Sequence, residues 1–178
     1  TPVISSAASD VYKRQIRTHL ELTGQPAEVP IDVVVWPETA LPALLYRDVW
    51  LREQITDILP DGAYLITGGL RRELLVKASD AKSGGAGDAP SETSVSENKK
   101  PWRSFNSVFV ISPEGNIEDF YDKHHLVPFG EYLPQQKFLE FLGLQQLTRL
   151  RGGFTAGVGP RSLALGSLGK SFSPLICY

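Results

Sequence analysis

The feature that most constrains the fold is an almost wholly apolar, β-branched run at residues 31–36, Ile-Asp-Val-Val-Val-Trp. Such a run is typical of a strand covered on both faces, and Pro37 would end it because proline donates no ladder hydrogen bond. A helical period follows over residues 43–59 and stops at Pro-Asp-Gly. Its apolar positions are Leu45, Val49, Ile55 and Leu59. Residues 63–69 read as a second buried strand, and this strand, helix, strand order predicts a layered α/β domain.

The rest of the chain divides into shorter segments. Residues 16–23 read as the end of a helix that a left-handed cap at Gly24 would stop. Residues 105–112 and 117–122 flank a Pro-Glu-Gly-Asn turn and are predicted to be strands. The remaining predictions are a short helix at 135–142, a glycine-rich loop at 152–160 and a final strand at 171–176 that leads to Cys177.

Two segments differ in character from the rest of the chain. Thr1 to Gln15 resembles a leader that recurs on fragmentary translated sequences, so we expect residues 1–15 not to be native and the domain to span residues 16–178. Residues 79–100 are rich in Ser, Gly, Glu, Asp, Ala and Lys, with Val95 as the one sizeable aliphatic side chain. Burial there could not offset the entropy of ordering, so we predict a flexible surface loop.

Composition excludes several kinds of function. A length of 178 residues suits one domain, and 18 Lys and Arg against 20 Asp and Glu give a net charge of −2 without a basic cluster, so we expect no nucleic-acid partner. No apolar stretch approaches the roughly 20 residues that a membrane helix needs. One cysteine excludes an internal disulfide framework and a cysteine-rich metal site. His124 and His125 would point apart on an extended segment, so we expect no metal site.

Three residues in separate settings are candidates for covalent acyl transfer. Glu38 follows the first predicted strand, Lys123 follows the strand at 117–122, and Cys177 ends the last apolar run. A cysteine attacks an acyl carbon only as the thiolate, so it needs a base or a nearby cation. If the three side chains converge, Glu38 can take and return the thiol proton while Lys123 stabilises the thiolate or a developing oxyanion.

Each of these residues also has a structural interpretation that the pattern alone leaves open. Cys177 lies in an apolar context that suits a small buried hydrophobic residue. Glu38 could be a carboxylate at a helix N-terminus, and Lys123 could be a solvated residue at a sheet edge. Catalysis therefore depends on whether the three side chains, far apart in the sequence, meet in space.

Three segments together closely resemble the carbon–nitrogen hydrolase, or nitrilase-like, superfamily. They are Trp-Pro-Glu-Thr-Ala-Leu-Pro at 36–42, Asp-Lys-His-His-Leu-Val-Pro-Phe-Gly-Glu-Tyr-Leu-Pro at 122–134 and Pro-Leu-Ile-Cys-Tyr at 174–178. Within the superfamily they resemble a membrane-bound branch that acylates lipoproteins. The likeness extends over residues 16–178. Its most specific part is 122–134, since simple amidases share the lysine but rarely the Val-Pro-Phe-Gly-Glu-Tyr continuation.

The resemblance implies an α-β-β-α sandwich, here truncated after the nucleophile strand, and it implies residue roles. By this likeness Glu38 is the general base, Lys123 stabilises the oxyanion, and Cys177 is the nucleophile. The other matching positions are Glu131, a family carboxylate that supports the active site, Tyr178, the residue after the nucleophile and expected to bind substrate, and Asn106, a structural position without a catalytic role.

The implied reaction is ping-pong and needs no cofactor. Cys177 would take an acyl chain from a membrane phospholipid as a thioester, and the α-amino group of a lipoprotein's diacylglyceryl-cysteine would receive it as an amide. The domain would face the periplasm of a Gram-negative bacterium, held at the inner membrane by helices outside this sequence. We expect the fragment alone to be poorly active. The alternatives are a soluble nitrilase-like amidase that uses water as acceptor and an inert nitrilase-like binding domain.

Overall fold

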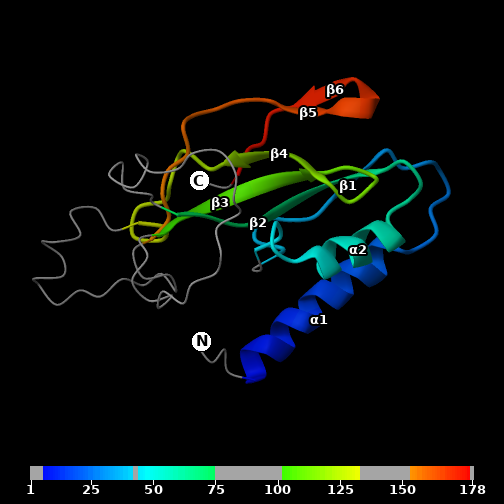
Figure 1. The fold of residues 1–178 in the computed structure, drawn as a ribbon, viewed down its shortest axis with the longest axis horizontal. Coiled ribbons are helices and arrows are strands. Elements are labelled where there is room, and N and C mark those ends of the chain that lie inside the picture. The colour runs from blue at the N-terminus through cyan, green and yellow to red at the C-terminus, as the bar shows by residue number, and fades with distance from the viewer. Residues whose placement is uncertain (1–5, 42–43, 75–101, 133–152, 177–178) are drawn as a thin grey trace, which may run out of the picture.

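The computed structural model describes residues 6–41, 44–74, 102–132 and 153–176, and a four-stranded mixed sheet lies at its centre (Figure 1). In spatial order the sheet consists of β1 (Val33–Val35), β2 (Tyr64–Leu74), β3 (Trp102–Ile111) and β4 (Ile117–Asp122). β1 pairs with β2 in parallel, whereas β2 with β3 and β3 with β4 are antiparallel pairs. β1, β2 and β4 therefore run in the same direction, and their carboxyl ends lie at one end of the sheet.

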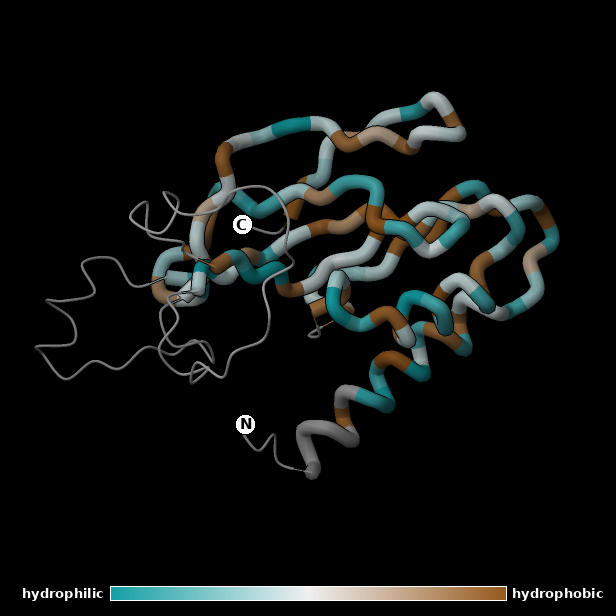
Figure 2. Tube along the Cα trace, viewed as in Figure 1, coloured by the Kyte–Doolittle hydropathy of each residue, from teal (hydrophilic) through white to brown (hydrophobic). Residues whose placement is uncertain are grey.

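Different elements cover the two faces of this sheet. Helices α1 (Ser6–Thr23) and α2 (Val49–Ile58) lie on one face, and a hairpin lies on the other (Figure 1). The hairpin consists of β5 (Leu163–Leu165), the 3-10 turn η3 (Gly166–Leu168) and β6 (Lys170–Phe172). Apolar segments recur along the central strands and in the elements that pack on them (Figure 2). The described residues thus form α, β and β layers, which confirms the predicted α/β class.

Two apolar clusters hold these layers together. The cluster on the helix face joins α1 and α2 to the sheet, and its largest fully buried members are Phe109, Leu41, Leu45, Leu51, Ile55, Leu65 and Ile111. The cluster on the hairpin face contains Tyr64, Val110, Tyr121, Leu163 and Leu165, with Ile176 packed against it. Side chains alternate between the faces of a strand, so neighbouring residues of β3 and β4 serve different layers.

Helix α1 ends where the sequence predicts, at Thr23, but not by the predicted cap. The amide of Gly24 donates to the carbonyl of Leu20 over 3.0 Å, while Gly24 is not among the residues with positive φ. The helix begins at Ser6 and so includes part of the predicted leader. That residues 1–15 are not native to the domain stays a prediction.

Helix α2 begins later than the apolar period predicts. Asp48 is its N-cap, and the Asp48 carboxylate accepts a hydrogen bond from the amide of Leu51 over 2.9 Å. Leu51 and Ile55 are buried, whereas Val49 is 53% exposed. The predicted start at residue 43 is therefore wrong, because the cap at Asp48 sets the first turn of the helix.

Strands β2 and β3 are longer than predicted. They pair from Leu65 with Ile111 to Leu74 with Trp102, and β2 continues through Arg71 and charged neighbours that break the apolar pattern. Cross-strand hydrogen bonds extend a strand without regard to the polarity of its side chains. The predicted turn before β4 is confirmed by Gly115, which has φ of 81° and donates its amide to the carbonyl of Ser112.

The first and last predicted strands are shorter than expected. β1 covers three residues; Val34 packs against the cluster on the helix face and Val33 against that on the hairpin face, whereas Val35 is 68% exposed, so the predicted coverage on both faces holds for Val33 and Val34 and is wrong for Val35. The predicted final strand at 171–176 is confined to Lys170–Phe172, and residues 173–176 are not in a strand. Its partner β5 was not predicted, because three residues are too few to show a period.

The remaining predictions concern loops and one helix. Residues 153–160 have no helix or strand, as the glycine-rich sequence predicts. The predicted loop at 79–100 and helix at 135–142 lie outside the described residues. Neither helix in the described ranges combines the length and the hydropathy required to traverse a bilayer.

Candidate functional site

A cluster of polar side chains lies at the end of the sheet where β1 and β4 finish. Lys123 Nζ is 3.0 Å from Glu131 Oε2 and 3.9 Å from Glu38 Oε1. The Asn106 side-chain amide donates to both carboxylates, over 2.6 Å to Glu38 Oε1 and 2.9 Å to Glu131 Oε1. Glu38 and Lys123, which were singled out from separate segments, are thus brought together, with one amide and a second carboxylate between them.

Glu38 reaches this cluster through a tight turn that follows β1. The amide of Ala40 donates to the carbonyl of Pro37 over 3.2 Å, and Thr39 has a left-handed backbone with φ of 56°. The turn then returns to the sheet, since the amide of Leu41 donates to the carbonyl of Gly68 over 3.2 Å. Helix α2 begins at Val49. The alternative that Glu38 is a helix N-terminal carboxylate is therefore wrong.

Gly68 on β2 allows this turn to lie directly against the sheet. A Cβ at position 68 would be 2.7 Å from Glu38 Cα and 2.7 Å from Thr39 N. Both are backbone atoms that cannot move aside as a flexible side chain would. A glycine is therefore required wherever the backbone carrying Glu38 contacts the strand so closely.

We expect Gly68→Ala to destabilise the protein by about 1–3 kcal/mol, because overpacking would force the turn that carries Glu38 away from β2. Denaturant unfolding measures the effect. Gly130→Ala is the matched control in the loop of Glu131, since its Cβ would lie an ordinary 3.5 Å from Val127 Cγ1. Equal unfolding free energies for the two variants would contradict the steric argument.

Lys123 follows β4 directly and is held by its backbone. Its amide donates to the carbonyl of Asn106 over 2.8 Å, and its carbonyl accepts from the amide of Gly157 over 2.9 Å. The residue is only 3% exposed. The alternative of a solvated lysine at a sheet edge is therefore wrong, and the ammonium is balanced by the carboxylates beside it.

Glu131 is held in the loop that follows Lys123. Its Oε2 accepts from the amide of Val127 over 2.9 Å, and its carbonyl accepts from the amide of Phe154 over 2.8 Å. Burial opposes ionisation of this carboxyl, but the hydrogen bonds from Val127 and Asn106 and the ammonium of Lys123 outweigh it and lower the Glu131 pKa. Glu131 is thus held as a carboxylate facing Lys123.

Asn106 was predicted to be structural only, and its contacts show a closer involvement in the site. It is 6% exposed on β3, and its side-chain amide donates hydrogen bonds to the same two carboxylates that pair with Lys123. The available sequence signal was an amide side chain inside an apolar strand, Phe-Asn-Ser-Val-Phe. Such a buried polar group needs hydrogen-bond partners, and here the partners are Glu38 and Glu131.

A cavity of about 470 Å³ adjoins Glu38. Its walls include the apolar side chains of Val35, Ile66 and Val108 from the sheet, and the segment 172–176 lies opposite. Ile176, the residue before Cys177, contributes to this wall, while Cys177 and Tyr178 lie outside the described residues. The cavity therefore combines an acid–base group with a surface for an apolar ligand.

Three other cavities in the described parts of the chain are not lined by a carboxylate that pairs with the buried Lys123. A cavity of about 510 Å³ between the end of α1 and residues 58–61 has no lysine, arginine or histidine in its lining. Within the described ranges no three His, Cys, Asp or Glu side chains are grouped to hold a metal ion. His124 instead contacts the hydroxyl of Tyr121 through Nδ1 at 2.7 Å. The cluster around Lys123 is therefore the candidate active site.

Comparison with known proteins identifies the family of the chain. The model of the carbon–nitrogen hydrolase family matches residues 12–178. Apolipoprotein N-acyltransferase of Bradyrhizobium diazoefficiens is 40% identical over 175 residues, which are 97% of this chain and 29% of that protein. The protein of the same name from Brucella suis biovar 1 is 40% identical over 164 residues, 89% of this chain and 27% of its own length. The chain thus spans under a third of these relatives.

A solved amidase structure is among those that overlap the chain. It is a crystal structure of N-terminal amidase with an Asn-Glu-Ala peptide, with a TM-score of 0.38 and 16% identity over 66% of this chain and 25% of the other. A likeness of that extent supports no functional inference.

Proposed function

Because the chain belongs to the carbon–nitrogen hydrolase family, we propose that it is the catalytic part of an apolipoprotein N-acyltransferase. The observation that carries the proposal is the pairing of Glu38 with Lys123 beside a cavity whose apolar wall includes Ile176, the residue before Cys177. The name of the 40% identical relatives supports the reaction class.

The proposed residues divide the work of acyl transfer. Glu38 takes the proton of Cys177, and the thiolate attacks the ester carbonyl of a phospholipid. Lys123 stabilises the tetrahedral oxyanion. When the ester C–O bond breaks, Glu38 returns the proton to the leaving alcohol, and the acyl group remains on Cys177 as a thioester.

In the second half of the reaction Cys177 is the leaving group, and Glu38 again takes and returns a proton. The α-amino group of a diacylglyceryl-cysteine attacks the thioester carbonyl, Glu38 takes a proton from the attacking nitrogen, and the C–S bond breaks. The proton returns to the thiolate, and the acyl group leaves as an amide. Every proton is thus moved by residues of this chain, and no cofactor is needed.

The exposure of the two carboxylates supports different roles for them. The side chain of Glu38 is 35% exposed, whereas that of Glu131 is 13% exposed and held by hydrogen bonds. Only Glu38 contributes to the cavity lining. We therefore assign proton transfer to Glu38 and assign to Glu131, together with Asn106, the positioning of Lys123 and Glu38.

The apolar surface beside Glu38 supports a lipid substrate. Val35 is 68% exposed and Leu175 is 91% exposed, and both contribute to the same cavity. Exposed apolar side chains around a polar centre suit an acyl chain attached to a reactive ester. On this proposal Tyr178 binds substrate, a phospholipid is the donor and a diacylglyceryl apolipoprotein is the acceptor. The full-length protein would lie in the bacterial inner membrane with this domain facing the periplasm.

The test uses the full-length protein and a phospholipid with a labelled transferable acyl chain. Without acceptor, label should accumulate on the protein and be released by hydroxylamine, as expected for a thioester. A diacylglyceryl-cysteine peptide should then take up the label as a hydroxylamine-stable amide. Release of labelled fatty acid without transfer would support the hydrolase alternative, and absence of protein-bound label would support the inert binding domain.

A further inference from the structure

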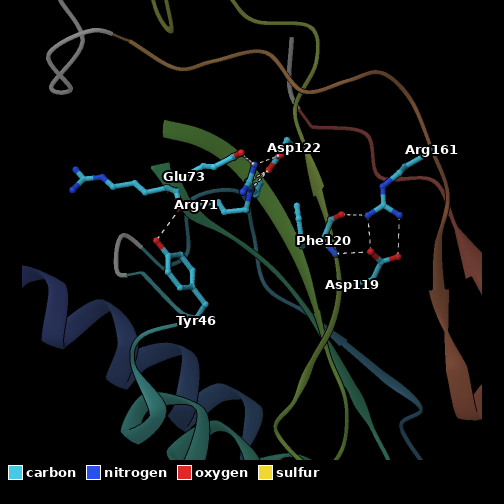
Figure 3. Close-up of polar contacts among 9 residues, drawn as sticks. Tyr46, Arg71, Glu73, Asp119, Phe120, Asp122 and Arg161 are labelled. Carbon is cyan, nitrogen blue, oxygen red and sulfur yellow. Dashed lines mark hydrogen bonds and ion pairs between the residues drawn. The ribbon is translucent and has the colours of Figure 1, made fainter. Parts of the chain in front are cut away.

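Arg71 on β2 forms a polar clamp across the back of the candidate site. Its Nε donates to Asp122 Oδ1 over 2.9 Å and its Nη2 donates to Asp122 Oδ2 over 2.7 Å, as Figure 3 shows. The hydroxyl of Ser107 donates to the same carboxylate over 2.6 Å. Since Arg71, Ser107 and Asp122 belong to β2, β3 and β4, the clamp joins three adjacent strands.

Two aromatic rings enclose the Arg71 guanidinium. Its central carbon is 4.2 Å from the ring centroid of Phe105 and 4.7 Å from that of Phe120. The side chains of Arg71 and Asp122 are only 16% and 13% exposed. A planar guanidinium can stack on rings while its edge binds a carboxylate in a bidentate manner, and an ammonium cannot do both. The clamp therefore depends on arginine, not on positive charge alone.

The clamp and the site are joined through the backbone, because Ser107 and Asp122 are the sequence neighbours of Asn106 and Lys123. Successive side chains of a strand point to opposite faces, so Ser107 and Asp122 point away from the face of Asn106 and Lys123. Ser107 is also the register partner of Asp122. Holding the Asp122 side chain therefore restrains the peptide that joins it to Lys123.

A glycine also contacts the same peptide. Position 157 has no room for a side chain, because a Cβ there would be 2.2 Å from the carbonyl oxygen of Asp122 and 2.8 Å from Asp122 Cβ. Its amide donates to the carbonyl of Lys123 over 2.9 Å. The contacts with Gly157 and the arginine clamp together thus leave the backbone that carries the Lys123 side chain little freedom.

We propose that Arg71 is a positioning residue, which acts through Asp122 to hold the Lys123 ammonium at the site of acyl transfer. The inference rests on the proposed function of that site. Asp122 directly precedes Lys123, and the clamp is its main side-chain restraint, so loss of Arg71 lets the end of β4 shift. A displacement of about 1 Å at a reacting group can lower a rate about a hundredfold.

A second ion pair on the same strand provides a matched control. Arg161 binds Asp119 through both Nη atoms, over 3.0 Å to Oδ2 and 2.5 Å to Oδ1 (Figure 3). This pair is also bidentate, but the Arg161 side chain is 42% exposed and Asp119 lies four residues before Lys123 on the strand. It has the bidentate chemistry of the clamp but forms no hydrogen bond with the Asp122 side chain, which directly precedes Lys123.

The test compares Arg71→Ala, Arg71→Lys, Asp122→Asn and Arg161→Ala in the full-length protein. We expect Arg71→Ala to lower kcat for thioester formation about 10- to 100-fold with KM unchanged, Arg71→Lys to lie between it and wild type, and Arg161→Ala to match wild type. Alkylation of Cys177 by iodoacetamide as a function of pH is the second measurement. A displaced Lys123 stabilises the thiolate less, so the midpoint should shift to higher pH by about one unit in the clamp variants.

The outcomes separate this inference from the proposed function. If clamp variants that remain folded match Arg161→Ala in both kcat and alkylation, the inference is wrong. Should Arg71→Ala fail to fold, Asp122→Asn decides, because it preserves side-chain shape and loses the ion pair. If thioester formation persists in Cys177→Ala, the proposed function fails, and the alkylation profile alone then confirms or overturns the effect of the clamp on Lys123.

Discussion

Replacement of Cys177 by alanine is expected to abolish thioester formation and acyl transfer in the full-length protein. Removing the nucleophile of a covalent mechanism lowers kcat about a millionfold, because the base and the oxyanion-stabilising cation then have no attacking atom to act on. Label transferred from the phospholipid to the protein, followed over time, measures the effect. Peptide mapping of the labelled wild-type protein should place the acyl group on Cys177.

Cys177→Ser is the informative companion to this variant. It retains an attacking oxygen of similar size, but a serine hydroxyl is far harder to deprotonate than a thiol, and Glu38 is a weak base for it. We expect Cys177→Ser to be as inactive as Cys177→Ala while unfolding like wild type. Transfer by either variant at the wild-type rate would remove Cys177 from the mechanism and favour its alternative as a small buried hydrophobic residue.

Replacement of Lys123 by methionine is expected to reduce both activity and stability. Methionine approximates the shape of lysine without its charge, so Glu131, 3.0 Å away in the native protein, would lose its cation. Breaking a buried pair by removing one partner costs about 3–5 kcal/mol, and loss of an oxyanion-stabilising group lowers kcat about a hundred- to a thousandfold. Denaturant unfolding and labelled acyl transfer measure the two effects separately.

A double variant distinguishes the structural role of Lys123 from its catalytic role. In Lys123→Met combined with Glu131→Gln, no unpaired charge remains at position 131, and the glutamine can still accept from the amide of Val127. Most of the lost stability should return, whereas activity should stay low because the oxyanion still lacks a cation. Recovery of activity together with stability would contradict the catalytic assignment and leave Lys123 as a structural ion-pair partner.

The candidate site could be predicted in part from local sequence. Glu38 follows the apolar strand β1 after Trp36 and Pro37, and Lys123 directly follows β4, whose start is marked by the turn at Gly115. Asn106 and Arg71 lie inside strands, where no turn or breaker distinguishes them. Their importance comes from partners 68 and 51 residues away, Glu38 and Asp122, which the sequence pattern does not specify.

The boundaries of the helices and strands likewise divide into those set by local sequence and those set by tertiary contacts. The turn before β4 was predicted correctly because Gly115 and its neighbours have strong local preferences. The start of α2 was predicted incorrectly, since Asp48 caps the helix at a point where the apolar period of the sequence has already begun. The extension of β2 through Arg71 depends on pairing with β3, and an antiparallel partner continues a strand where side-chain polarity would end it.

By itself the sequence determined the α/β class, the order of the central strands along the chain, and the strand ends that carry Glu38 and Lys123. These follow from apolar runs, prolines and turn residues, whose effects act over a few neighbouring positions. Only the tertiary structure decided that Asn106 bridges Glu38 and Glu131, that Gly68 admits the turn of Glu38, and that the Arg71 clamp lies behind Lys123. Each of these contacts joins different strands or loops, and its geometry exists only once the sheet has paired in register.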